Sequence, residues 1–316
     1  MIAEKHLNEG LFKLRFRAMG SPCLVQFRAA SVEQAKQFRR ECLGWLKAFE
    51  ETWSRFRPDS LLSRINRHAG IAAVEITPEQ DEILEVCRQT VELSGGIGDP
   101  TTLPLTQLWD RAAGKGCEPT AAEIRRTLEL VGWRQVEHSP GRVFLPRPGM
   151  ALDFGGFGKE YAADQVRAIA LRLGIRNALI DLGRDIASCG SPAGADFWVV
   201  AIENPHTPDR GTFRLRLHGQ AVAGSGGSRR FRTIGGVRYS HHIDPRTGRP
   251  AESDVVAASC VARDCLTAGI FSRNACILGS RDGLELMRQQ PGVEGIIQTA
   301  GSFHLTPSFH HHALSL

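Results

Sequence analysis

The stretch that decides the fold is Leu152-Asp153-Phe154-Gly155-Gly156-Phe157-Gly158-Lys159. Residues 151–154 are mostly apolar and predict a strand, and residues 159–173 have helical spacing that ends at Gly174. A helix that begins directly after a glycine-rich turn presents unpaired backbone N–H groups and the positive end of its dipole. The stretch is therefore suited to bind phosphate, although its residues alone fit a plain tight turn equally well.

Two common nucleotide-binding motifs are excluded at this turn. Glu160 follows Lys159 where a P-loop has Ser or Thr, and the glycines do not have the G-x-G-x-x-G spacing.

The sequence before this stretch predicts two strands followed by helices. The expected elements are two strands within residues 12–27 joined by a tight turn at 18–22, a long amphipathic helix over 32–56, a short helix over 61–66 capped by Asp59 or Ser60, and a helix that begins at Thr77-Pro78 and runs to Glu92. The sequence after it predicts strands over 178–182 and 197–202, a hairpin of 212–217 with 221–224, an apolar helix over 264–278, and a hairpin of 293–298 with 302–305.

This mixture predicts an α+β fold. At 316 residues we expect one domain over residues 1–316, with two lobes around a central cleft and a boundary near residue 145. No run of about 18 apolar residues occurs and the N-terminus lacks a signal-peptide pattern, so we expect a cytoplasmic protein with no membrane partner.

Charge and cysteine content exclude further classes. A net charge of +5 suits anionic ligands, but without a basic stripe or aromatic platform it does not indicate nucleic-acid binding. The eight cysteines include no C-x-x-C pair, and we expect mostly reduced, buried thiols.

Two other loops carry candidate chemistry. Residues 223–230 (Ala-Gly-Ser-Gly-Gly-Ser-Arg-Arg) suit anion recognition or a flexible hairpin tip. In residues 239–250, Asp244-Pro245-Arg246-Thr247-Gly248 predicts a fixed turn that holds His241 or His242 beside it for catalysis, or a structural histidine. His310-His311-His312 is expected to be a solvent-exposed tail, with metal binding as the alternative.

Taken together, these segments resemble the ApbE family of flavin transferases from about Phe16 to Gly279. The resemblance is carried by Ala18-Met19-Gly20-Ser21, residues 54–60 with 63–66, Asp99-Pro100-Thr101, residues 152–156 with Lys159, residues 177–183, Ala223 with Ser225-Gly226, and Ser240-His241 with residues 243–250. It implies a two-lobed α+β fold with FAD in the cleft. It also implies transfer of FMN from FAD to a Thr or Ser of an acceptor protein.

The resemblance also implies roles for individual residues. His241 is expected to be catalytic beside the phosphates, and Phe56 keeps the stacking face of the Tyr that is more frequent there. The FAD contacts are expected at Met19, Phe56, Gly98, Asp99, Pro100, Asp153, Gly155, Lys159, Ser225 and Ile243.

The chain departs from the family at the expected magnesium site. Gly269 stands where the family has a ligating Asp, and Arg273 where it has a ligating Thr, which leaves only a backbone carbonyl, that of Gly158. One neutral ligand does not hold Mg²⁺. Arg273 can instead bind the pyrophosphate through its planar guanidinium, which makes it a second candidate catalytic residue. Arg184 also replaces a family glycine.

Two hypotheses follow from this departure. The chain is an FAD:protein FMN transferase with an altered phosphate site, or it is a catalytically inactive flavin-binding module.

Overall fold

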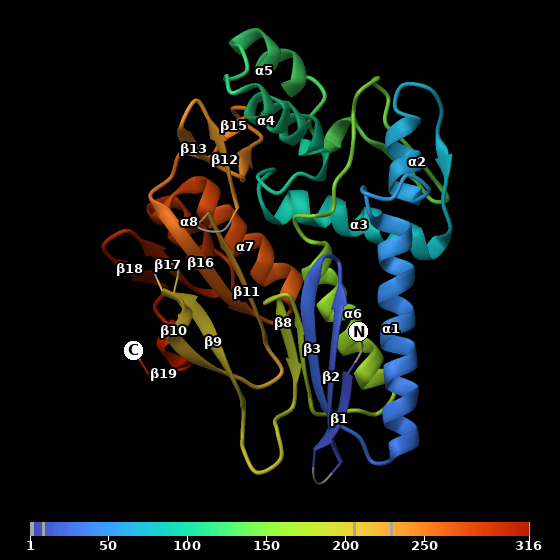
Figure 1. Ribbon diagram of the computed structural model, residues 1–316, viewed down its shortest axis with the longest axis vertical. Coiled ribbons are helices and arrows are strands. Elements are labelled where there is room, and N and C mark those ends of the chain that lie inside the picture. Colours follow the sequence, from blue (N-terminus) through green and yellow to red (C-terminus); the bar gives the residue numbers. More distant parts are fainter. Residues whose placement is uncertain (1–2, 8–9, 205–206, 228–229, 316) are drawn as a thin grey trace.

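The computed structural model describes residues 3–7, 10–204, 207–227 and 230–315. An antiparallel sheet of nine strands forms its centre, in the order β1-β2-β3-β7-β8-β11-β16-β17-β18 (Figure 1). The strands are β1 (Ala3–Leu7), β2 (Leu11–Ala18), β3 (Ser21–Arg28), β7 (Ala178–Leu182), β8 (Ile186–Cys189), β11 (Ala221–Gly226), β16 (Val255–Ala262), β17 (Glu294–Thr299) and β18 (Phe303–Leu305).

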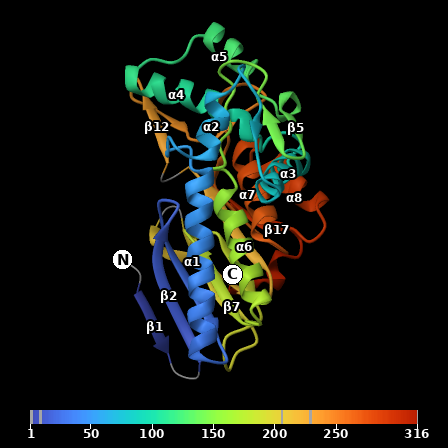
Figure 2. The same ribbon diagram turned by 90° about the vertical axis from the view of Figure 1, so that its right-hand side faces the viewer.

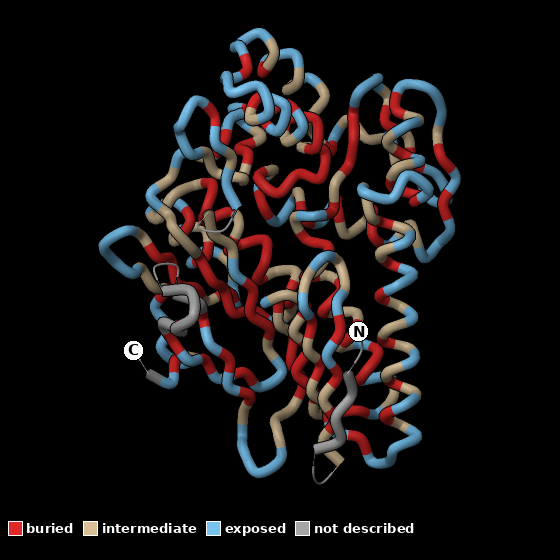
Figure 3. Tube along the Cα trace, in the orientation of Figure 1, coloured by how far each residue is buried: buried red, intermediate tan, exposed pale blue. Residues whose placement is uncertain are grey.

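Helices and a second sheet cover the two faces of this sheet. One face packs against α1 (Val32–Trp53), α6 (Gly158–Arg172), α7 (Cys265–Leu278) and α8 (Ser280–Gln289), and the other against a small sheet of β9 (Trp198–Asn204), β10 (Thr207–Leu217) and β19 (Ala313–Ser315). Side chains alternate accordingly, since Ala221 and Ala223 belong to the helix-side core and Val222 to the other. Figure 3 shows the buried residues along these layers.

A smaller group of elements lies beyond the end of the large sheet (Figures 1 and 2). It contains α2 (Leu61–Arg67), α3 (Pro78–Leu93), α4 (Leu103–Lys115), α5 (Ala121–Leu128), β4 (Val74–Glu75), β5 (Glu137–Ser139), β6 (Arg142–Phe144), β12 (Phe231–Ile234), β13 (Val237–Ser240), β14 (Ile243–Asp244), β15 (Arg249–Pro250) and the 3₁₀ turn Pro100–Thr102. Two further 3₁₀ turns are Trp133–Gln135 and Phe309–His311. A separate core joins α4 and α5 to β12 and β14.

The predicted α+β class is confirmed, and several of the predicted helices begin at side-chain caps. The side chain of Ser60 accepts the N–H of Ser63, Thr77 and Gln80 form a capping box, and Asp264 accepts the N–H of Thr267. The tight turn between β2 and β3 consists of Met19 and Gly20, both with positive φ. Such a two-residue turn matches the twist of the strands that it joins.

Three predicted elements need correction. The helix expected over residues 32–56 ends at Trp53, with Ser54 as its C-cap, and leaves Phe56 in a loop. Residues 151–154 are not a strand, because the N–H and C=O of Leu152 bond to the side chain of Asn66 and the N–H of Asp153 bonds to the carbonyl of Pro100.

The hairpin of 212–217 with 221–224 is the third error. Thr207–Leu217 pairs with β9 and β19, whereas Ala221–Gly226 pairs with β8 and β16. Both strands have an apolar face. The two sheets pack on each other through these faces, so the two strands are not hydrogen-bonded neighbours in one sheet.

The C-terminal histidines are not a free tail. Phe309 beside them is fully buried, the C=O of His312 accepts the N–H of Arg216, and Ala313–Ser315 forms β19. His310 and His311 are exposed and His312 is half-buried. The cysteines are as expected: all eight are free, and only Cys117 is exposed. None of the helices in the described part of the chain has the length and apolarity of a membrane span.

Candidate phosphate-binding site

The glycine-rich turn lies at the N-terminus of α6. The N–H groups of Phe157 and Gly158 both bond to the carbonyl of Phe154, and the rings of Phe154 and Phe157 pack 5.2 Å apart in the core. These aromatic anchors leave Gly155 exposed and Gly156 half-buried. No side chain caps the helix, so the N–H groups of its first turn that follow Gly158 remain available to an anion.

Two carboxylates fix the ends of this turn. Asp153 accepts the N–H of Gly155 at 3.1 Å and pairs with Arg55, whose Nε lies 3.2 Å from its Oδ2. At the other end, Lys159 forms an ion pair with the buried Asp185. Burial, together with the nearby charge of Glu160, raises the pKa of Asp185 to about 7, while Lys159 opposes the rise. Lys159 is therefore directed at Asp185.

Arg273 reaches the turn from α7, which packs beside α6 (Figure 2). Its Nη2 donates a hydrogen bond to the carbonyl of Gly156, and its Nε is buried without a partner among the described residues. An ideal Cβ on Gly156 would overlap this guanidinium, so a larger residue here would displace Arg273 from the turn. The side chain of Arg273 therefore points inward, onto the glycine turn.

Positions 269 and 273 supply no side-chain ligand for Mg²⁺. Gly269 contributes no ligand, and Arg273 brings a positive charge to the adjacent turn carbonyl. Within the described ranges, no three His, Cys, Asp or Glu side chains form a group able to hold a metal ion. Neither Gly269 nor Arg273 supplies a side-chain oxygen, whereas a hard divalent cation is held by several oxygen ligands.

The loop before α4 supports the glycine turn through hydrogen bonds. Asp99 is buried, and its carboxylate accepts the N–H and hydroxyl of Thr101 and the N–H of Trp133. The carbonyl of Pro100 accepts the N–H of Asp153 at 2.9 Å, and the N–H of Gly98 bonds to Ser94 Oγ at 2.9 Å. The side chain of Asp99 therefore organises the loop, and Pro100 holds the turn through its backbone.

Ser225 and the Met19 turn approach the same helices. Ser225 Oγ lies 3.3 Å from Ser272 Oγ on α7. Met19 donates its N–H to Glu50 Oε2 at 3.1 Å, and an ideal Cβ on Gly183 would lie 2.7 Å from the Ser21 Cβ and 3.8 Å from the Lys159 Cδ. The Met19 turn and the start of α6 thus meet at Gly183.

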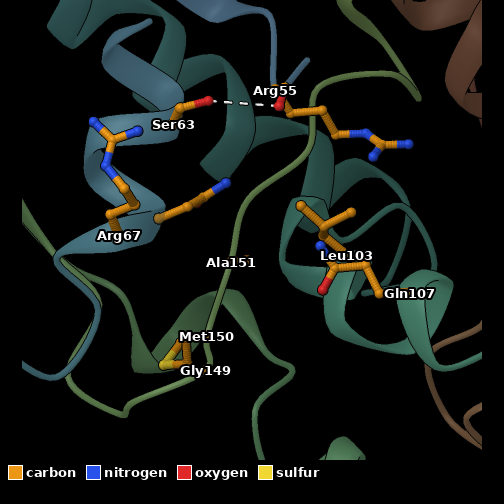
Figure 4. Close-up of a pocket in the computed structure, with 9 residues that line it drawn as sticks. Arg55, Ser63, Arg67, Leu103, Gln107, Gly149, Met150 and Ala151 are labelled. Carbon is orange, nitrogen blue, oxygen red and sulfur yellow. Dashed lines mark hydrogen bonds between the residues drawn. The ribbon is translucent and has the colours of Figure 1, made fainter. Parts of the chain in front are cut away.

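Phe56 is an exposed ring beside a small cavity. Its side chain is 79% exposed, and the Arg55 guanidinium carbon lies 4.1 Å from the ring centroid. Arg55 also lines a cavity of about 360 Å³ with Ser63, Asn66, Arg67, Leu103, Gln107 and residues 149–151 (Figure 4). Because Arg55 pairs with Asp153, this cavity adjoins the glycine turn.

His241 and His242 are half-buried and uncharged. Their ring centroids are 3.8 Å apart, and His241 Nδ1 and His242 Nε2 lack partners among the described residues. Burial, helped by the positive charges of Arg230, Arg232 and Arg273, lowers the pKa of His241 to about 4, and burial lowers that of His242 as well. A neutral imidazole can accept a proton.

The turn after the histidines is fixed, as the sequence predicts. The N–H of Gly248 bonds to the carbonyl of Asp244 at 2.8 Å, and Trp109 Nε1 donates to the carbonyl of Gly248 at 2.8 Å. Gly248 has φ +70, and an ideal Cβ would lie 2.8 Å from Ile124. Ile243 is buried in the core that joins this turn to α4 and α5, so its side chain serves packing.

Sequence reasoning missed Glu160 and Asp185, two buried carboxylates beside Lys159 and Arg273. The available signal was the acidic residue directly after the glycine turn, which served above only to exclude a P-loop.

Comparisons with known proteins agree with this architecture. The ApbE family model matches residues 19–297. The chain is 30% identical to the FAD:protein FMN transferase of Treponema pallidum over 284 residues, 85% of this chain and 78% of that protein, and 26% identical to one from Klebsiella pneumoniae, covering 89% and 87%.

Solved structures of the family have the same fold. The crystal structure of the ApbE protein from Thermotoga maritima superposes with a TM-score of 0.85 at 26% identity, covering 96% of this chain and 100% of that one. The flavin transferase ApbE of Vibrio cholerae gives 0.81 at 23% identity, covering 99% and 100%. The glycine turn, the fixed histidine loop and these matches, which extend over most of the chain, lead to one conclusion: the chain belongs to the ApbE family.

Proposed function

We propose that this protein is an FAD:protein FMN transferase, which moves FMN from FAD to a Thr or Ser hydroxyl of an acceptor protein. The names of its relatives support the reaction class. The observation that carries the proposal is the uncapped start of α6, with the Arg273 guanidinium on its glycine turn. The positive charge of Arg273 also contributes to the lowered pKa of both histidines.

The donor site that we propose lies in a cleft between two lobes of a single domain. Backbone N–H groups at the start of α6 and the guanidinium of Arg273 would hold the pyrophosphate. The exposed ring of Phe56 would stack on a planar ring of the nucleotide. The remainder of the FAD site would be lined or supported by Met19, Gly98, Asp99, Pro100, Asp153, Gly155, Lys159, Ser225 and Ile243.

The chemistry is one phosphoryl transfer. The acceptor hydroxyl oxygen bonds to the phosphorus on the FMN side, the bond from that phosphorus to the AMP oxygen breaks, and AMP leaves. His241 would take the hydroxyl proton as the new bond forms, on the ring nitrogen Nδ1 that has no partner among the described residues. Arg273 would balance charge on the phosphates as the bond breaks.

We further propose that this transfer does not depend on Mg²⁺, because the positively charged guanidinium of Arg273 already lies at the glycine turn. The alternative, an inactive flavin-binding module, is favoured by one observation: a guanidinium neutralises charge but cannot coordinate the reacting oxygens as a metal does.

A flavinylation assay separates these proposals. The protein is incubated with FAD and a flavin-acceptor domain, in EDTA or in millimolar Mg²⁺, and denatured gels are inspected for protein-bound flavin fluorescence. We expect equal labelling in both buffers, a fall of about 10² or more in rate for His241→Gln, and no change for His310→Gln, an exposed control.

Two results would contradict the transferase proposal. FAD binding with no labelled acceptor in either buffer would support the inactive module. The absence of any flavin fluorescence quenching up to about millimolar FAD would refute both candidates.

A further inference from the structure

The side chain of Glu160 fills the space beside Gly269. An ideal Cβ on Gly269 would lie 2.6 Å from Glu160 Cγ and 2.9 Å from Glu160 Oε1. Glu160 belongs to α6 and reaches α7 across the interface at which the two helices pack. A carboxylate from a different helix therefore occupies the place of a side chain at position 269.

This carboxylate is buried without a full set of partners. Glu160 is 9% exposed, and its Oε2 has no hydrogen-bond partner among the described residues. A buried carboxylate is costly unless a nearby cation compensates it. The adjacent Asp185 is paired with Lys159, and Arg273 on α7 likewise has a buried Nε without a described partner.

Helix geometry relates Glu160 to Arg273. Side chains at positions i and i+4 of a helix lie on the same face. Because Glu160 occupies the side-chain space of position 269, its carboxylate stands where an acidic residue one turn before Arg273 would stand. Burial lowers the pKa of Arg273, and among the neighbouring carboxylates Glu160 opposes this most strongly, ahead of Asp153 and Asp185.

We propose that Glu160 is a positioning residue that holds the Arg273 guanidinium over the glycine turn, in place to receive the pyrophosphate of a nucleotide. The inference rests on the proposed function, in which that pyrophosphate belongs to FAD. Glu160, Gly269 and Arg273 then act as one unit that replaces the Asp and Thr expected from the family pattern.

The direction in which a mutation of Glu160 changes nucleotide affinity separates this positioning role from simple charge repulsion. A carboxylate near a phosphate site repels the ligand, so removal of its charge should strengthen binding if charge is all that matters. If Glu160 positions Arg273, removal of its charge should weaken binding instead.

The experiment measures the affinity of the full chain for FAD, for ADP and for riboflavin, which lacks phosphate. We expect Glu160→Gln to weaken FAD and ADP binding about tenfold and to leave riboflavin binding within about twofold. Arg273→Gln should weaken FAD and ADP at least as much, and the double variant should be no weaker than Arg273→Gln, because coupled residues are not additive. Asp164→Asn, which neutralises another carboxylate of α6, should stay within about threefold for all three ligands.

A second set of variants moves the carboxylate from α6 to α7 and tests for rescue of binding. This set also tests the proposal if Glu160→Gln does not fold. Glu160→Gly should weaken FAD binding about tenfold. Adding Gly269→Asp, which places a carboxylate one turn before Arg273 on α7 itself, should restore it to within about threefold of the wild type.

The outcomes are distinguishable. If the wild type binds ADP and FAD but Glu160→Gln binds them equally or more tightly, or if the transplant restores nothing, the positioning role is refuted while FAD binding stands. If the wild type binds neither nucleotide, the proposed function fails and this inference fails with it.

Discussion

Replacing Gly269 by Asp should destabilise the protein, although it adds a better helix former. Asp gains roughly a few tenths of a kcal/mol of helix propensity over Gly. Its Cβ would lie 2.6 Å from Glu160 Cγ, and overpacking of this kind costs about 1–3 kcal/mol. The new carboxylate also stands beside that of Glu160, so we expect a net loss of about 2 kcal/mol in the free energy of unfolding.

Thermal unfolding followed by circular dichroism measures this loss. About 2 kcal/mol corresponds to a Tm lower by roughly 4–8 °C in domains of 150–250 residues, and this longer chain should lie at the lower end. The control is Glu160→Gly with Gly269→Asp, in which the space is vacated before it is refilled, and its Tm should recover at least half of the loss. A Tm of Gly269→Asp within about 1 °C of the wild type would refute the packing of Glu160 against Gly269.

Three further predictions concern the same region. FAD affinity should change less than about threefold, roughly 0.7 kcal/mol, between EDTA and millimolar Mg²⁺, measured by fluorescence quenching, whereas Glu160→Gly/Gly269→Asp/Arg273→Thr should gain about tenfold with Mg²⁺. His241 has its pKa lowered to about 4 from about 6.5, so it contributes stability above pH 6.5 that is lost as the pH falls towards 4. Urea unfolding of His241→Gln should therefore lose roughly 2 kcal/mol less than the wild type between pH 6.5 and 4. Arg184 has φ +81, which costs about 1–2 kcal/mol for an L-residue, and Arg184→Gly should raise stability by roughly 0.5–1 kcal/mol after the entropy of glycine is deducted.

Each of these three predictions has a result that would contradict it. A tenfold gain in wild-type affinity with Mg²⁺ would mean that other residues supply ligands, and an unresponsive triple variant would mean that the two restored ligands are insufficient. Parallel pH curves for wild type and His241→Gln would show that His241 is not held neutral. A less stable Arg184→Gly would show that the arginine side chain stabilises its turn by more than its backbone strain costs.

Local features of this protein could be predicted from the sequence because they depend on residues close together in the chain. The Ser60, Thr77 and Asp264 caps satisfy backbone N–H groups three residues away, and the Met19-Gly20 turn joins two neighbouring strands. The apolar run of one segment likewise predicts α7, and the pattern around residues 300–301 predicts the β17–β18 hairpin. The family pattern, which is a set of such local motifs in order, could be recognised for the same reason.

Contacts between distant segments were decided only by the tertiary structure. Residues 151–154 look like a strand, but the side chain of Asn66 and the carbonyl of Pro100 take their hydrogen bonds. The strands 207–217 and 221–226 look like a hairpin, but their apolar faces pack in two stacked sheets.

The phosphate site depends both on local sequence features and on contacts between distant segments. The sequence by itself determined that Gly269 and Arg273 stand in place of the expected ligands and that a glycine turn precedes α6. Only the packing of α6 on α7 decided that Glu160 fills the space left by Gly269 and that Arg273 rests on Gly156. The physical reason is that a side chain's neighbours across a helix interface depend on how the two helices are set against each other, which no pattern within either helix specifies.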